Sequence, residues 1–259
     1  MKTLFAGATA LALLLPACAM AAAIDGTWKA STDSAQAPKK PDVYELVKNV
    51  YSCKTCTPAF SVPADGNYHS VKGNPYYDAV AIRPASNGVT EMDSKGGKMV
   101  TTSTTTLSAD GKTATTTFSD TSASSTPVKG TVVARKVAAG PAGSHPISGS
   151  WQVVGYSGFS DNGLSITYKT QGDTVNMSTP TGQSYSAKLG GPAVPYKGDP
   201  GTDTVQVKMD GKSLVETDMR KDKVIAVVTS TPAADGKSIS VTFDNKLKGT
   251  SMSFTAKKQ

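Results

Sequence analysis

The chain has 259 residues, a mass of 26.7 kDa and a formal net charge of +7. Apolar residues (38%) and the 24 glycines together reach about 47% of the chain, a share typical of globular proteins, which excludes wholesale disorder. The 27 basic residues form no long run and have no aromatic interleaving, so no nucleic-acid partner is predicted. Two histidines and three cysteines argue against a His-rich metal site.

Residues 1–23 have the pattern of a secretory signal peptide. Lys2 precedes an apolar run, Leu4 to Leu15, that is too short to span a bilayer, and Ala21–Ala23 offer small residues for cleavage. We therefore expect a periplasmic or secreted protein that begins near Ile24. No later apolar run is long enough to predict a transmembrane segment.

A lipid anchor is the alternative at this end of the chain. Leu15-Pro16-Ala17-Cys18 is similar to a bacterial lipobox, in which Cys18 would carry the lipid, although Pro16 departs from the usual residue. Only five residues would then separate Cys18 from the first expected strand, so the sequence favours ordinary cleavage.

The rest of the chain contains an internal duplication. A shift of 125 residues aligns 65–118 with 190–243 without a gap, and a shift of 123 aligns Ile24–Trp28 with Ile147–Trp151. The two tryptophans of the chain both lie in these openings. A Pro/Gly-rich segment, 138–146, separates the copies. The duplication predicts domain one at 24–137, a linker at 138–146 and domain two at 147–259.

Each copy is predicted to consist of short strands joined by turns. Runs such as 164–168, 223–229 and 238–243 are β-branched or aromatic, and Asp-Gly pairs supply hairpin turns. We count eight or nine short strands per copy. No segment shows the 3.6-residue apolar periodicity of an amphipathic helix. The Thr-rich runs 101–106 and 113–117 are interpreted as a strand pair rather than a mucin-like stalk. The predicted fold is all-β, with two tandem antiparallel meanders that form barrels or sandwiches.

The Gly-x-Trp opening of each short meander resembles that of the lipocalin-like (calycin) barrels. In that family the tryptophan closes one barrel end, and a basic residue of the last strand packs across it. The resemblance implies that Trp28 and Trp151 are buried structural residues, each covered by a basic residue of its own domain. The candidates are Arg135 or Lys136 in copy one, and Lys257 or Lys258 in copy two.

The mature chain is also similar to a group of secreted bacterial proteins. The shared segments are Tyr-x-Cys-Lys-x-Cys, Pro-Tyr-Tyr-Asp, Gly-Pro-Ala-Gly-Ser-His and Asp-Asn-Gly-Leu, found here at 51–56, 75–78, 140–145 and 161–164. This resemblance implies export and points to no particular activity.

Cys53-Lys54-Thr55-Cys56 predicts a local disulfide, because a dithiol in an exported protein normally oxidises. The alternative is a redox-active CxxC, which depends on a helix N-terminus. Tyr51-Ser52 before the motif and Thr57-Pro58 after it predict no helix, so a structural disulfide is favoured.

Two acidic pairs recur at the same place in both copies, Glu91/Asp93 and Glu216/Asp218. Their spacing puts each pair on one face of a strand, as acid/base catalysis or cation binding requires. Basic residues follow across a predicted hairpin, however, and we interpret both pairs as exposed cross-strand charge ladders. These basic residues are Lys95, Lys98, Arg220 and Lys223.

An aromatic and histidine cluster specific to copy one is the candidate ligand-binding set: Tyr68, His69, Tyr76, Tyr77 and Asp78. These residues could line the mouth of a pocket, or they could pack around a long loop. No nucleophile elbow, P-loop or dinucleotide fingerprint appears in a fitting context, so no catalytic residue, metal ligand or cofactor is assigned.

The sequence thus favours an exported, non-enzymatic binding protein that carries a small apolar or amphipathic ligand in a lipocalin-like barrel. A structural or interaction module of the cell envelope is the alternative, and an enzyme built on Glu91/Asp93 or the tyrosine cluster ranks third. An enclosed apolar cavity inside a barrel would favour ligand carriage, whereas filled interiors would favour the structural role.

Overall fold

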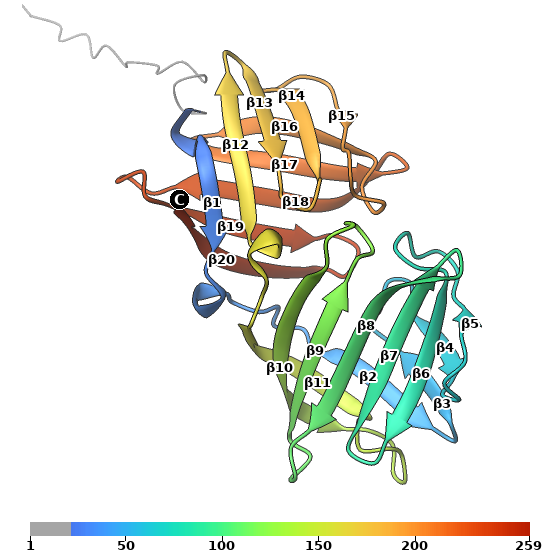
Figure 1. Ribbon diagram of the computed structural model, residues 1–259. Helices are drawn as coiled ribbons and strands as arrows, with labels where there is room; N and C mark the ends of the chain where they lie inside the picture. The colour runs from blue at the N-terminus through green and yellow to red at the C-terminus, as the bar shows by residue number, and fades with distance from the viewer. Residues whose placement is uncertain (1–21) are drawn as a thin grey trace, which may run out of the picture.

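The computed structural model describes residues 22–259, so the expected signal peptide and Cys18 lie outside the described residues. The chain folds into two antiparallel sheets of ten strands, each curled into a nearly closed barrel (Figure 1). Three short 3-10 helices accompany them: η1 (Ala22–Ile24), η2 (Thr32–Ser34) and η3 (Asp161–Gly163). In this part of the chain, no helix has the length and apolar character needed to cross a membrane. The predicted all-β class is confirmed.

We call the first sheet barrel one. Its spatial order is β4-β3-β2-β11-β10-β9-β8-β7-β6-β5. In chain order the strands are β2 (Asp42–Val47), β3 (Val50–Cys53), β4 (Phe60–Pro63), β5 (His69–Ser70), β6 (Ala79–Ala85), β7 (Gly88–Lys95), β8 (Lys98–Leu107), β9 (Thr113–Asp120), β10 (Val128–Ala139) and β11 (Gly149–Ser157).

We call the second sheet barrel two. Its spatial order is β14-β13-β12-β1-β20-β19-β18-β17-β16-β15. The strands are β1 (Gly26–Ala30), β12 (Ser165–Gln171), β13 (Thr174–Ser178), β14 (Ser184–Lys188), β15 (Val194–Pro195), β16 (Thr204–Asp210), β17 (Ser213–Arg220), β18 (Lys223–Pro232), β19 (Ser238–Asn245) and β20 (Thr250–Lys258). Each sheet has more strands than the sequence predicted, because β5 and β15 span two residues each and carry no recognisable pattern.

The two barrels close at equivalent places. The backbone N–H of Gly66 donates to the carbonyl of Ile82, and that of Gly190 donates to Val207, at 2.9 and 2.8 Å. Ile82 and Val207 are equivalent at the shift of 125 residues. The Thr-rich runs lie in β8 and β9, as predicted, and pair along their length. The duplication in sequence is therefore also a duplication in structure.

The first strands of the two copies are exchanged. β1 carries Trp28 from the start of copy one, yet it pairs with β12 and β20 of copy two. β11 carries Trp151 from the start of copy two, yet it pairs with β10 and β2 of copy one. Figure 1 shows β1, in blue, among the yellow and red strands of barrel two.

This exchange departs from the domain bounds expected from the repeat, 24–137 and 147–259. Barrel one is one continuous segment, 42–157, inserted between the first and second strands of barrel two. The expected linker 138–146 joins two neighbouring strands of the same sheet, β10 and β11. The true crossings are 31–41 and 158–164. The repeat could not reveal this, because the two Gly-x-Trp strands are similar enough to fit either sheet.

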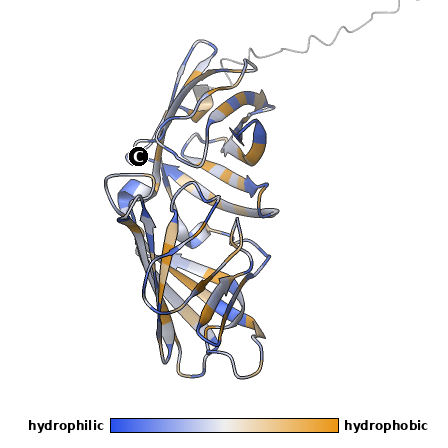
Figure 2. Ribbon diagram, turned by 90° about the vertical axis from the view of Figure 1, so that its right-hand side faces the viewer, coloured by the Kyte–Doolittle hydropathy of each residue, from blue (hydrophilic) through white to orange (hydrophobic). Residues whose placement is uncertain are grey.

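Each barrel encloses its own core. In barrel two the core contains Trp28, Tyr168, Leu214 and Ile239, and in barrel one it contains Trp151 with the residues Leu46, Tyr51, Val62, Val80 and Ile82. Apolar and polar residues alternate along many of the strands (Figure 2), as expected when one face of a sheet is buried and the other faces water. Burial of the inward face stabilises each barrel by roughly 25 cal/mol per Å² of apolar surface.

Candidate ligand-binding cavities

A tryptophan is buried inside each barrel, under a lysine. Trp28 is fully buried, its indole N–H donates to the Ile24 carbonyl at 2.7 Å, and the Lys258 ammonium lies 5.2 Å from the ring centre. Trp151 repeats the arrangement with the Ile147 carbonyl at 2.8 Å and the Lys136 ammonium at 4.7 Å. The cation–π contact expected from the lipocalin resemblance is present in both barrels.

Two details of that expectation need correction. Each lysine comes from the other sequence copy, because the Trp-bearing strands are exchanged. In barrel one the cation is Lys136 rather than Arg135: Arg135 is its neighbour on β10, so its side chain leaves the opposite face of the strand and is exposed. Lys136, and not Arg135, is therefore the basic residue that covers Trp151.

The glycine of each Gly-x-Trp motif has a steric role. Gly26 and Gly149 have φ values of +134° and +142°, which residues with a side chain rarely adopt. A Cβ on Gly26 would lie 2.5 Å from Cε of Lys258, the lysine that covers Trp28. A Cβ on Gly149 would lie 2.5 Å from the Ala138 carbonyl oxygen. The motif thus requires glycine where the last strand passes closest to the first.

The candidate ligand-binding cluster is divided among three places. Tyr68 is exposed, and His69 forms a pair with Asp65 at 2.9 Å on the surface. Asp78 accepts a hydrogen bond from the backbone N–H of Gly96 at 2.9 Å, which fixes a hairpin turn. Tyr76 and Tyr77 alone line a cavity, and it lies between the two barrels. The cluster adjacent in sequence is therefore not one site.

The acidic pairs are buried, which corrects their interpretation as exposed charge ladders. Asp93, Glu216 and Asp218 are 7%, 4% and 8% exposed, and Glu91 is partly buried. Among the described residues, none of the four forms an ion pair with Lys or Arg. The sequence contains a signal for this burial. Glu91 and Asp93 share a strand face with Val89, and Glu216 and Asp218 share one with Leu214, so the acids belong to the apolar, inward face.

Tyrosines surround the buried acids. The Tyr168 hydroxyl donates to Glu216 at 2.6 Å, and Tyr51 is the hydrogen-bonding neighbour of Glu91 in barrel one. Burial raises the pKa of Glu216 to about 7 and that of Asp218 to about 6, the latter with a contribution from the charge of Asp199. Burial also raises the pKa values of Glu91 and Asp93. These carboxyl groups can therefore hold a proton near neutral pH.

Barrel one contains a partly open cavity of about 410 Å³. Its walls combine apolar side chains with hydroxyl groups and the Glu91 carboxyl group. The lining includes Tyr44, Tyr51, Val89, Glu91, Ser103, Thr105, Ala114, Thr116, Val132, Ile147 and Trp151. This volume lies within the roughly 300–1,000 Å³ range of small-molecule sites, and mostly apolar walls with a few polar groups are typical of them.

Barrel two fills the equivalent space with larger side chains. Matching strand registers place Leu214, Ile239 and Phe254 where barrel one has Val89, Ala114 and Val132. Leu214 and Ile239 are fully buried, and Phe254 packs against the core of barrel two. The cavity of barrel one therefore arises from smaller residues at inward positions of the same fold.

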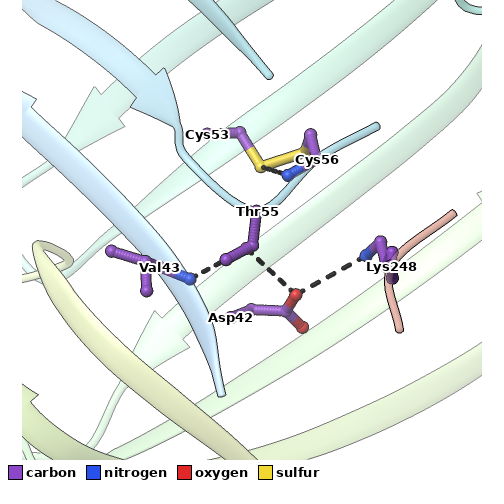
Figure 3. The surroundings of a disulfide bond; sticks show 6 residues. All are labelled: Asp42, Val43, Cys53, Thr55, Cys56 and Lys248. Carbon is purple, nitrogen blue, oxygen red and sulfur yellow. Dashed lines mark hydrogen bonds and ion pairs between the residues drawn. A yellow bond between two sulfur atoms is a disulfide. The ribbon is translucent and has the colours of Figure 1, made fainter. Parts of the chain in front are cut away.

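The predicted disulfide between Cys53 and Cys56 is confirmed, and Figure 3 shows its surroundings. The Cys56 N–H donates to the Cys53 sulfur at 3.1 Å. Within the turn, Thr55 Oγ1 accepts from the Val43 N–H at 3.0 Å and donates to Asp42 at 3.2 Å. Asp42 also pairs with Lys248 of barrel two at 3.6 Å, so the turn lies at the junction of the barrels.

Residues 22–259 contain no group of three or more His, Cys, Asp or Glu side chains arranged to hold a metal ion. Comparisons with protein-family models, curated proteins and solved structures found no match to this chain. The function is therefore argued from the cavities themselves.

Proposed function

We propose that this is an exported, non-enzymatic binding protein that holds a small, neutral amphipathic molecule inside barrel one. The observation that carries the proposal is the cavity of about 410 Å³, which is present in barrel one and filled by larger residues in barrel two. A duplicated fold in which only one copy has small residues at these inward positions is expected when that copy binds a ligand there and the other serves as a support.

The lining suggests the chemistry of the ligand. Val89, Ala114 and Val132 offer an apolar wall, so most of the ligand is expected to be apolar. Glu91 and Tyr51 offer a polar group at one side, and burial raises the pKa of both. A protonated carboxyl group can donate a hydrogen bond as well as accept one, which suits a hydroxyl or carbonyl group on a neutral ligand.

Barrel two fits the alternative function, a structural or interaction module, because Leu214, Ile239 and Phe254 fill the space that is open in barrel one. The two functions are compatible in one chain. Barrel one would carry the ligand, and barrel two would connect it to other parts of the cell envelope.

Titration with N-phenyl-1-naphthylamine, a neutral apolar dye that fluoresces when it leaves water, tests the proposal. The mature protein should bind the dye, and Val132→Phe should weaken binding at least tenfold, or about 1.4 kcal/mol, by filling the cavity. Barrel two has Phe254 at the equivalent position, so the fold accommodates the larger side chain.

Val137→Phe is the matched control, because Val137 lies on the same strand and is 55% exposed. It should leave dye binding unchanged. Equal binding by the wild type and Val132→Phe, or no binding at all, would show that the barrel-one cavity is not a ligand site. Mass spectrometry of natively purified protein would add the identity of any retained molecule and the state of residues 1–23.

A further inference from the structure

A second cavity, of about 550 Å³, lies between the two barrels. Residues of β17, β18 and β19 line it from barrel two, and the loop around Tyr76 and Tyr77 lines it from barrel one. Cys56 and Thr57, held by the disulfide turn, contribute to the same wall. The cavity therefore exists only when both barrels are in place.

Three tyrosines contribute to its wall. Tyr76 and Tyr77 come from barrel one, and Tyr196 comes from barrel two. Tyr76 reaches across to barrel two because position 201 is a glycine: a Cβ on Gly201 would lie 2.1 Å from the Tyr76 hydroxyl. Gly201 and Tyr76 are equivalent at the shift of 125 residues, so the two copies differ at the position where they meet.

Four charged residues line this cavity, and two of them are engaged within the protein. Asp199 accepts hydrogen bonds from the Gly201 N–H at 3.0 Å and from the Thr202 hydroxyl at 2.7 Å. Lys248 pairs with Asp42 at 3.6 Å. These two side chains maintain the loops around the cavity.

The other two charged side chains form no hydrogen bond or ion pair with the residues that the structure describes. Asp218 is 8% exposed, and its Oδ1 has no hydrogen-bond partner among the described residues. The side chain of Arg220, two residues along β17, forms no ion pair or hydrogen bond within residues 22–259. A buried carboxylate oxygen without a partner is destabilising, so a donor from outside the protein would stabilise it.

We propose that the cavity between the barrels binds a small zwitterion of the amino-acid type. Its protonated amine would donate to Asp218, and its carboxylate would pair with Arg220, whose planar guanidinium matches carboxylate geometry. Its side chain would lie against the tyrosines, whose ring faces also attract the ammonium group. The two unengaged charges of opposite sign make a zwitterion a better fit than a simple cation or anion.

The experiment uses the full mature chain and a panel of the common L-amino acids, first by thermal shift and then by calorimetry. At least one of them should bind, and Asp218→Asn and Arg220→Gln should each weaken that binding tenfold or more. The amine and the carboxylic acid derived from the same amino acid, each with one charge removed, should bind more weakly than the zwitterion.

The internal repeat provides matched controls. Asp93→Asn and Lys95→Gln make the same changes at the equivalent positions of barrel one, and neither should affect amino-acid binding. Val132→Phe should also leave it unchanged, so failure of the barrel-one site and failure of this site are distinguishable. Absence of binding by every amino acid, or unchanged affinity in both Asp218→Asn and Arg220→Gln, would overturn the proposal.

Discussion

At the scale of single residues, the most unusual feature is a carboxyl group enclosed among apolar and aromatic side chains. Glu216 is 4% exposed, and its hydrogen-bonding neighbour Tyr168 is also buried. Burial disfavours the charged form and raises the pKa of Glu216 from its ordinary 4.5 to about 7. In the unfolded chain the same group would ionise near its ordinary value.

This difference predicts that stability falls as pH rises. Between about pH 4.5 and pH 7 the unfolded state releases the Glu216 proton while the folded state retains it, so the free energy of unfolding decreases. At about 1.4 kcal/mol per pKa unit, Glu216 alone accounts for roughly 2–4 kcal/mol. Thermal unfolding at a series of pH values should show a lower melting temperature at pH 7 than at pH 5.

Glu216→Gln should flatten this pH dependence, since the amide cannot ionise and its oxygen can still accept from Tyr168. Glu91, Asp93 and Asp218 shift in the same direction, so part of the dependence should remain. Glu45→Gln is the control, because Glu45 pairs with Lys54 at the surface. A melting temperature that rises from pH 5 to pH 7 in the wild type would contradict the assignment.

At the scale of elements, the exchanged strands decide which barrel each tryptophan supports. Trp151 lies in the core of barrel one with Ile147, and β11 pairs with β10 and β2. Trp28 lies in the core of barrel two with Ile24. The sequence repeat, read without the structure, assigns each tryptophan to the opposite barrel.

Trp151→Ala should therefore destabilise barrel one by about 3–5 kcal/mol, the usual range for removal of a buried tryptophan. Trp28 would then be the only tryptophan, and its fluorescence would report on barrel two. The fluorescence transition should stay near its wild-type temperature, while circular dichroism should show an added transition at lower temperature. Trp28→Ala should give the reciprocal pattern, and the opposite assignment in both variants would show that the strands are not exchanged.

At the scale of the whole molecule, one barrel is inserted into the other. Barrel one is a continuous segment with all ten strands between residues 42 and 157. Barrel two is assembled from 26–30 and 165–258, so its first strand precedes the insertion and the other nine follow it. The crossings 31–41 and 158–164 join the two units.

The fragment 42–157 should consequently fold by itself. Its far-UV circular dichroism should be that of a β protein, with a cooperative thermal transition. The fragment 24–137 has nearly the same length but replaces β11 with β1, and it should melt at a lower temperature because β1 has five residues where β11 has nine. Higher stability of 24–137 would favour the domain bounds given by the repeat.

Much of the architecture could be predicted from the sequence because it depends on local patterns. Asp-Gly turns, alternating strands and the repeated Gly-x-Trp opening all act over a few residues, and they indicated two antiparallel meanders. The Cys53–Cys56 disulfide could be predicted for the same reason, since the two cysteines are close in sequence. The candidate cluster Tyr68–Asp78 was predicted less well, because sequence neighbours in a loop point in different directions.

The sequence by itself determined the all-β class, the duplication and the chemistry available at each strand position. The tertiary structure decided which copy receives each Trp-bearing strand, because β1 and β11 are similar and their pairing depends on contacts between distant segments. It also decided which face of β7 and β17 turns inward, and with it the burial of the acidic pairs. Both cavities also depend on the tertiary structure. Val132 leaves a cavity in barrel one, and Phe254 fills the equivalent space in barrel two, only after the strands have closed into barrels. The other cavity forms only where the two barrels meet.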